Sequence, residues 1–158
     1  MALQLTILVG TMTSTAELVA QAVQLATEED GVRIDIKPMD GLDAGVFAGG
    51  GLYLICTSTY GQGDVPDNAK ALYASLQDVR PDLSQVEYGV IALGDRTYAE
   101  TFCFGGKRFD ELLSELGAHR LGEVFRHDAS AGTMPEELAA DWALGWMERA
   151  KASCALAA

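Results

Sequence analysis

The chain has 158 residues, of which 49% are hydrophobic and 22% are charged, as in an ordinary globular domain. Its net charge of −12 makes nucleic acid and anionic membrane surfaces poor partners. No apolar run reaches the roughly 18 residues that a membrane span needs, and no basic segment precedes an apolar stretch as in a secretory signal. Three cysteines without a CxxC pair indicate a reduced, cytoplasmic setting. We expect residues 1–158 to form one domain.

Strand-like and helical patterns alternate along the chain, as they do in a sheet built from βαβ units. The expected strands are short runs that are either continuously apolar or alternate apolar with polar residues: Leu3–Val9, Val32–Ile36, Gly51–Cys56, Tyr88–Leu93 and Leu121–Phe125. The sequence thus predicts an α/β fold, a doubly wound sheet of five parallel strands with helices on both faces.

Helical patterns fill the gaps between these strands. The expected helices extend from Ser14 to about Thr27, from Pro66 to Gln77, from about Phe104 to a stop at Gly117, and onward from a cap at Thr133. Their apolar faces should comprise Leu18, Val19, Ala22, Val23 and Leu25; Ala69, Leu72, Tyr73 and Leu76; Phe109, Leu112, Leu113 and Leu116; and Leu138, Trp142, Gly145 and Trp146.

The segment Gly10–Glu17 lies between a strand and a helix, where backbone N–H groups and the helix dipole favour an anion. Four hydroxyl residues lie in it, Thr11, Thr13, Ser14 and Thr15, but no Lys or Arg. The segment matches neither the Walker A loop nor the G-x-G-x-x-G fingerprint. By itself it could bind a phosphate, or it could be a polar turn with a good helix cap.

Two tyrosines follow the next two strands. Tyr60 lies beside Gly61 and close to Gly63, which lets the backbone approach a flat ligand, and Tyr98 has the equivalent place after the following strand. Stacking on one aromatic ring contributes roughly 0.5–1.5 kcal/mol beyond area burial. Because the carboxyl ends of parallel strands gather at one edge, the two rings and the phosphate loop together indicate flavin mononucleotide (FMN).

These loops resemble those of the flavodoxin family. The segments TSTYGQGDVPDNA and LGDRTYAETFCFGGKRFDELLSELGA are similar to its short-chain type, and most similar to MioC-like stand-alone flavodoxins and to the FMN modules of diflavin reductases. The resemblance covers essentially the whole chain. It implies an electron carrier with non-covalently bound FMN and no catalytic residue of its own.

The resemblance also implies roles for individual residues. The loop from Thr11 to Ala16 would bind the phosphate, Tyr60 and Tyr98 would flank the ring, and the Tyr60–Gly61 peptide would reorient on reduction. The full set of implied FMN-binding residues is Thr11, Met12, Thr13, Ser14, Thr15, Ala16, Thr57, Ser58, Thr59, Tyr60, Gly61, Leu93, Gly94, Asp95, Tyr98, Phe102 and Cys103.

Three residues depart from the family pattern or modify it. Ser14 stands where the family usually has glycine, and Ala16 stands where some members have a hydroxyl residue. Arg96 would place a positive charge near the flavin, favour its anionic reduced form and raise its potential. His119 and His127 show no metal-ligand spacing, so we expect no metal.

The expected partners are a flavodoxin reductase-type electron donor and a redox acceptor protein with basic docking surfaces. An acidic rim at the flavin edge would attract them, formed by Asp64, Asp67, Asp95, Glu100 and Asp128. We expect a monomer. Two alternatives stay open at this stage: an FMN-dependent reductase that takes hydride from NAD(P)H to reduce quinone-type compounds, and a flavin-loaded accessory subunit. A receiver-type signalling module is disfavoured, because no acidic cluster follows the first strand.

Overall fold

The computed structural model describes residues 3–11, 15–59, 65–94, 103–128 and 131–157. Its strands are β1 (Leu3–Gly10), β2 (Val32–Pro38), β3 (Gly51–Thr57), β4 (Val86–Gly94), β5 (His119–Arg120) and β6 (Phe125–Asp128). Its α-helices are α1 (Thr15–Thr27), α2 (Lys70–Val79), α3 (Phe104–Glu115) and α4 (Pro135–Ala157), with short 3-10 helices η1 (Ala44–Phe47) and η2 (Asp67–Ala69).

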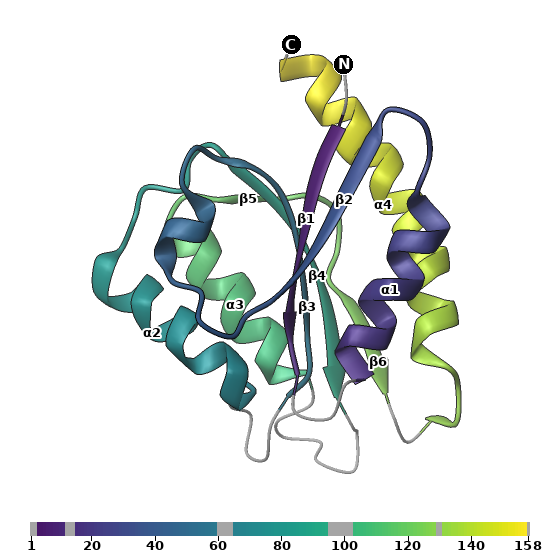
Figure 1. The fold of residues 1–158 in the computed structure, drawn as a ribbon, viewed down its shortest axis with the longest axis horizontal. Coiled ribbons are helices and arrows are strands. Elements are labelled where there is room, and N and C mark those ends of the chain that lie inside the picture. Colours follow the sequence, from purple (N-terminus) through teal and green to yellow (C-terminus); the bar gives the residue numbers. More distant parts are fainter. Residues whose placement is uncertain (1–2, 12–14, 60–64, 95–102, 129–130, 158) are drawn as a thin grey trace.

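The strands form one sheet in the order β2-β1-β3-β4, with β5 and β6 both paired to β4 and every pairing parallel. In such a sheet, ligands bind beyond the carboxyl ends of the strands where the strand order reverses, a rule drawn in part from flavodoxins themselves. Here the reversal lies between β1 and β3, whose carboxyl ends lie at the lower edge in Figure 1.

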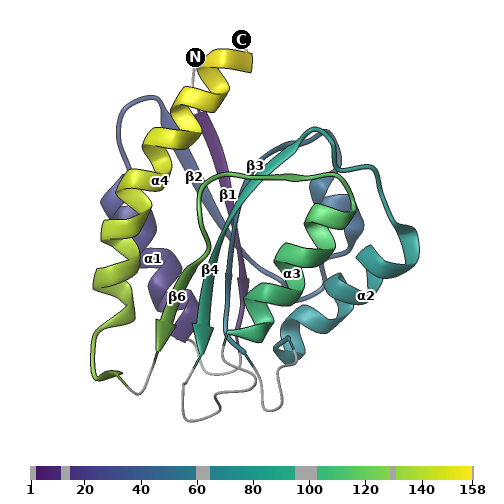
Figure 2. The same cartoon turned by 180° about the vertical axis from the view of Figure 1, so that it is seen from behind.

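Helices cover both faces of the sheet (Figures 1 and 2). On one face α1 and α4 pack against Leu5, Ile7 and Val9 of β1, and on the other face α2 and α3 pack in the cluster that contains Leu8. Ile7, Leu8 and Val9 alternate between the two cores, so this part of β1 is continuously apolar, whereas Gln4 is exposed and Thr6 is half-buried. The predicted doubly wound α/β fold is confirmed.

The predicted fifth strand, Leu121–Phe125, is wrong in its bounds. The structure has two short strands instead, β5 before this segment and β6 from Phe125 onward. Gly122 between them has a φ of +70°, which breaks the extended backbone. The Leu121 carbonyl accepts a hydrogen bond from the Trp146 indole at 3.0 Å, so α4 holds the chain at this bend.

The buried faces of α1 and α4 also differ from the prediction. Leu18 and Leu25 are 54% and 74% exposed, while the face of α1 toward the core is formed by Ala16, Val19, Ala20 and Val23. In α4 Leu138 and Gly145 are exposed, and the buried residues are Ala139, Ala143, Trp146, Met147 and Ala150. Alanines on both helices allow α1 and α4 to pack closely side by side, which leaves the larger leucines outside.

The remaining helix predictions largely agree with the structure. Ala69, Leu72 and Leu76 are buried under α2, and all four predicted apolar residues of α3 and its end are buried. The α3 helix ends at Glu115, just ahead of Gly117. The last helix begins at Pro135, two residues after Thr133, so Thr133 does not take the expected place of the N-cap. Its hydroxyl contacts the His127 ring instead.

Candidate functional site

The carboxyl edge of the sheet brings together residues from the segments that follow β1, β3 and β4. Of the predicted FMN-binding residues, the structure places these at or next to that edge: Thr11, Thr15, Ala16, Thr57, Ser58, Thr59, Leu93, Gly94 and Cys103. The others lie outside the described residues: Met12, Thr13, Ser14, Tyr60, Gly61, Asp95, Tyr98 and Phe102. Arg96, Asp64 and Glu100 lie outside them as well.

The start of α1 lies at this edge, and the N-terminus of a helix favours an anion. Thr11 directly follows β1, and α1 begins at Thr15, so its first N–H groups lack helical partners at this edge. Ala16 is fully buried, and its carbonyl accepts a hydrogen bond from the Cys56 thiol at 3.3 Å. Burial raises the pKa of Cys56 to about 12, so the thiol stays protonated and ties the first turn of α1 to β3.

Asn68, which the sequence reasoning missed, anchors the first residue of this loop. Its Oδ1 accepts a hydrogen bond from the Thr11 N–H at 2.8 Å. Its Nδ2 donates to the Val9 carbonyl and to Asp40 Oδ2, both at 3.2 Å. The only local signal is a polar residue ahead of a helix, a pattern that usually indicates a cap.

The segment after β3 is fixed by backbone contacts on both sides. The Ser58 N–H donates to the Gly10 carbonyl at 2.9 Å. The Thr59 hydroxyl donates to the Leu93 carbonyl and accepts from the Gly105 N–H, both at 3.0 Å. Thr57 is fully buried, so of the predicted residues that the structure describes here, Ser58 and Thr59 are the two that reach the surface.

Glycines at the end of β4 and at the start of α3 lie very close to the backbone of neighbouring segments. A Cβ added to Gly94 would lie 2.6 Å from the Cys103 backbone nitrogen, and one added to Gly105 would lie 2.3 Å from the Ser58 carbonyl oxygen. Cys103 itself has a left-handed backbone with φ of +59°, and its buried thiol donates to the Ala92 carbonyl at 3.3 Å. Such strain in a residue with a side chain persists only where the surroundings impose it.

His127, which the sequence did not place in any flavin loop, lies in β6 at the same edge. In the sheet it is opposite Leu93, and Asp128 is opposite Gly94. The His127 ring is buried, with Nε2 lying 2.9 Å from the Thr133 hydroxyl. This contact joins β6 to the segment before α4.

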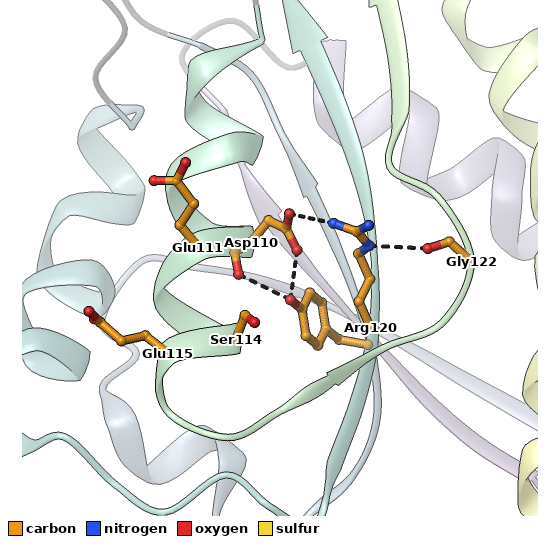
Figure 3. A pocket seen from close by; sticks show the side chains of 7 residues that line it. Asp110, Glu111, Ser114, Glu115, Arg120 and Gly122 are labelled. Atoms are coloured by element: carbon orange, nitrogen blue, oxygen red, sulfur yellow. Dashed lines mark hydrogen bonds and ion pairs between the residues drawn. The ribbon is translucent and has the colours of Figure 1, made fainter.

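A hollow of about 560 Å³ lies between α3 and β5, away from the carboxyl edge (Figure 3). The Tyr88 hydroxyl donates to Asp110 Oδ1 at 2.7 Å, and Arg120 contacts Asp110 Oδ2 at 2.6 Å. Burial, together with the Asp110 carboxylate, raises the pKa of Tyr88. Tyr88 precedes Gly94 by six residues, about 20 Å along the strand. These groups satisfy one another, so we interpret the cluster as structural.

Among the described residues, no helix is both long enough and apolar enough to cross a membrane. No group of three or more His, Cys, Asp or Glu side chains in the described segments could hold a metal ion.

Comparison with known proteins decides the family. The flavodoxin family model matches residues 7–142. The chain belongs to the flavodoxin family. This flavodoxin is 37% identical over 145 residues to Flavodoxin YqcA of Pectobacterium carotovorum subsp. carotovorum, covering 92% of this chain and 95% of that protein. It is 32% identical over 147 residues to Protein MioC of Escherichia coli (strain K12), covering 93% and 98%.

The predicted likeness to both kinds of relative is confirmed. Over 140 residues this flavodoxin is 37% identical to the sulfite reductase [NADPH] flavoprotein alpha-component of Vibrio parahaemolyticus, covering 85% of this chain and 22% of that protein. A solved flavodoxin from Pseudomonas aeruginosa has the same fold, with a TM-score of 0.82 at 36% identity, covering 94% of this chain and 99% of that one.

Proposed function

We propose that this flavodoxin binds one FMN non-covalently at the carboxyl edge of its sheet and transfers electrons between partner proteins. One observation carries the proposal. Beside the point where the strand order reverses, the segment after β3 is hydrogen-bonded to the end of β1 through Ser58–Gly10 and to the end of β4 through Thr59–Leu93. A ligand that contacts all three segments fits this arrangement.

The described residues fit the two ends of FMN. The hydroxyl groups of Thr11 and Thr15 and the first N–H groups of α1 are donors suited to a phosphate. At the other end, the close approach of Cys103 to Gly94 fixes the backbone at the end of β4, against which the edge of the flavin ring would lie. When bound, FMN supplies the redox chemistry, while the protein binds and orients it. Ring stacking by Tyr60 and Tyr98 stays a prediction.

The partners we propose are a reductase-type donor and an acceptor protein that dock through basic surfaces. The net charge of −12 supports this, and Asp128 lies at the edge beside Gly94. The likeness to a sulfite reductase flavoprotein supports the exchange of electrons with a reductase. Docking of this kind should weaken as salt concentration rises. A monomeric state and a cytoplasmic location stay predictions.

The test is the visible absorption spectrum of the purified protein, followed by release and chromatography of any bound chromophore. We expect a two-banded yellow spectrum and released FMN. A colourless protein that gains no flavin spectrum on addition of FMN would overturn the proposal. Incubation of the protein with NAD(P)H and a quinone, without any partner protein, distinguishes the alternative: a carrier should not oxidise NAD(P)H at a steady rate, whereas a reductase of quinone-type compounds should.

A further inference from the structure

Asn68 contacts three separate segments through one side-chain amide. It lies in η2, between β3 and α2, and is half-buried. Its partners are the backbone N–H of Thr11, the carbonyl of Val9 at the end of β1, and the carboxylate of Asp40 just after β2. The side chain therefore joins the β3–α2 connection to the first residue of the phosphate loop.

Only an amide side chain of this length can make all three contacts. Oδ1 accepts from Thr11, and the two hydrogens of Nδ2 serve Val9 and Asp40. The Val9 carbonyl also accepts from the Met39 N–H at 2.9 Å, so both of its lone pairs have partners. A carboxylate could accept from Thr11 but could not donate, and alanine could do neither.

The bond to Thr11 orients a peptide at the critical place. Gly10 ends β1 and its carbonyl is held by the Ser58 N–H, while the N–H of the same peptide, on Thr11, is held by Asn68. Both ends of the Gly10–Thr11 peptide are thus fixed by the β3–α2 connection. The direction in which the chain leaves β1 toward the start of α1 follows from the plane of this peptide.

We propose that Asn68 is a positioning residue for the phosphate end of the FMN site. It touches the phosphate loop from the protein side, and it couples that loop to the segment that follows β3. The inference rests on the proposed function. Because the coupling acts on the phosphate loop, losing it should weaken FMN binding and leave binding of riboflavin, which lacks the phosphate, almost unchanged.

The test compares the affinities of apoprotein variants for FMN and for riboflavin, measured by quenching of flavin fluorescence. In Asn68→Ala the preference for FMN over riboflavin should fall about tenfold, the equivalent of one or two hydrogen bonds. The matched control is Ser75→Ala, which removes a side-chain acceptor for the Ala44 N–H at 3.0 Å on α2, away from this edge. Its preference for FMN should equal that of the wild type.

A second variant guards against failure of Asn68→Ala to fold. Asn68→Asp has the same shape and keeps the acceptor for Thr11, but it loses both donors and places a second carboxylate beside Asp40. Because the acceptor for Thr11 remains, it should lose part of the preference for FMN, but less than Asn68→Ala does. An unchanged preference in these variants would overturn the inference, and so would an equal loss for both flavins, which would indicate only a general loosening.

The failure of the proposed function would be visible separately, because the wild type would then bind neither flavin. In that case hydrogen exchange at the Thr11 amide, followed by NMR in the apoprotein, still tests whether Asn68 holds the Thr11 N–H in place. We expect at least tenfold faster exchange in Asn68→Ala than in the wild type and no change in Ser75→Ala. Equal exchange rates in all three proteins would overturn the positioning role.

Discussion

The contact between Gly105 and Ser58 allows a test of how tightly the proposed FMN site is built. In Gly105→Ala the new Cβ would lie 2.3 Å from the Ser58 carbonyl oxygen, and ordinary contact begins at 3.4 Å, so the segments must separate by about 1.1 Å. Both sides of the contact are backbone, so no flexible side chain can yield. Overpacking of this kind costs about 1–3 kcal/mol.

Helix propensity works in the opposite direction. Replacing glycine by alanine within a helix stabilises it by about 1 kcal/mol, and Gly105 is the second residue of α3. The net expectation for Gly105→Ala is a loss of up to about 2 kcal/mol in the free energy of unfolding. The matched control is Gly145→Ala, since Gly145 lies on the exposed face of α4 with nothing within 4 Å of the added carbon. That variant should gain about 0.5–1 kcal/mol.

The assay is urea denaturation of both apoprotein variants and of the wild type, with FMN affinity as a second readout. A change of 1 kcal/mol corresponds to about 2–4 °C in the melting temperature for a chain of this size. FMN affinity should fall in Gly105→Ala and stay constant in Gly145→Ala. The reasoning is refuted if both variants are stabilised alike, because the Ser58 segment would then be free to move away.

Three further results are expected. Cys103→Gly should be more stable to urea than Cys103→Ala by about 1 kcal/mol, the reverse of the usual order, because the φ of this position is +59°; the usual order would mean that the strain is absent. Tyr88→Phe should lower the free energy of unfolding by about 1–2 kcal/mol at pH 7 through loss of the bond to Asp110. The fold raises the pKa of Tyr88, so above about pH 10 the unfolded wild type loses the Tyr88 hydroxyl proton while the folded protein keeps it. The free energy of unfolding of the wild type should therefore fall more steeply above this pH than that of Tyr88→Phe. Parallel pH profiles would contradict this. FMN affinity should not fall as salt concentration rises, because Gly10–Glu17 contains no Lys or Arg; a tenfold fall, measured by fluorescence titration, would show that a cation from elsewhere contacts the phosphate.

The sequence predicted those features that depend on local pattern. Largely apolar runs identified β3 and β4 because both faces of these strands are covered, and the 3.6-residue period identified the buried face of α3. The bend at Gly122 was missed because the Trp146 indole, 25 residues from Leu121, holds it. The outward leucines of α1 were misassigned because large apolar residues are no guide to orientation where two alanine-rich faces pack together.

Asn68 was missed for a related reason. Its hydrogen bonds to Thr11 and Val9 join residues that are 57 and 59 positions apart, so no local pattern could reveal them. The tyrosines, in contrast, were inferred from local context alone, and they lie outside the described residues. Sequence reasoning thus proposed the groups that would touch the cofactor, whose roles stay predictions, and it missed a group that holds one of those segments in place.

The supporting contacts matter because of the chemistry of the phosphate loop. A phosphate carries up to two negative charges, yet this loop offers only hydroxyl and N–H donors, in a protein with a net charge of −12. Neutral donors compensate for the lack of a positive charge only if they already point to one place before the ligand arrives, since reorienting them on binding would consume the interaction energy. Asn68 fixes the entry to the loop, the Cys56–Ala16 bond fixes its exit into α1, and Thr59 fixes the neighbouring segment to β4. These three side chains hydrogen-bond to the protein itself, and by doing so they hold the hydroxyl and N–H donors of the loop in position for a phosphate. In a loop that contained a lysine, the positive charge would make affinity depend less on these supporting bonds.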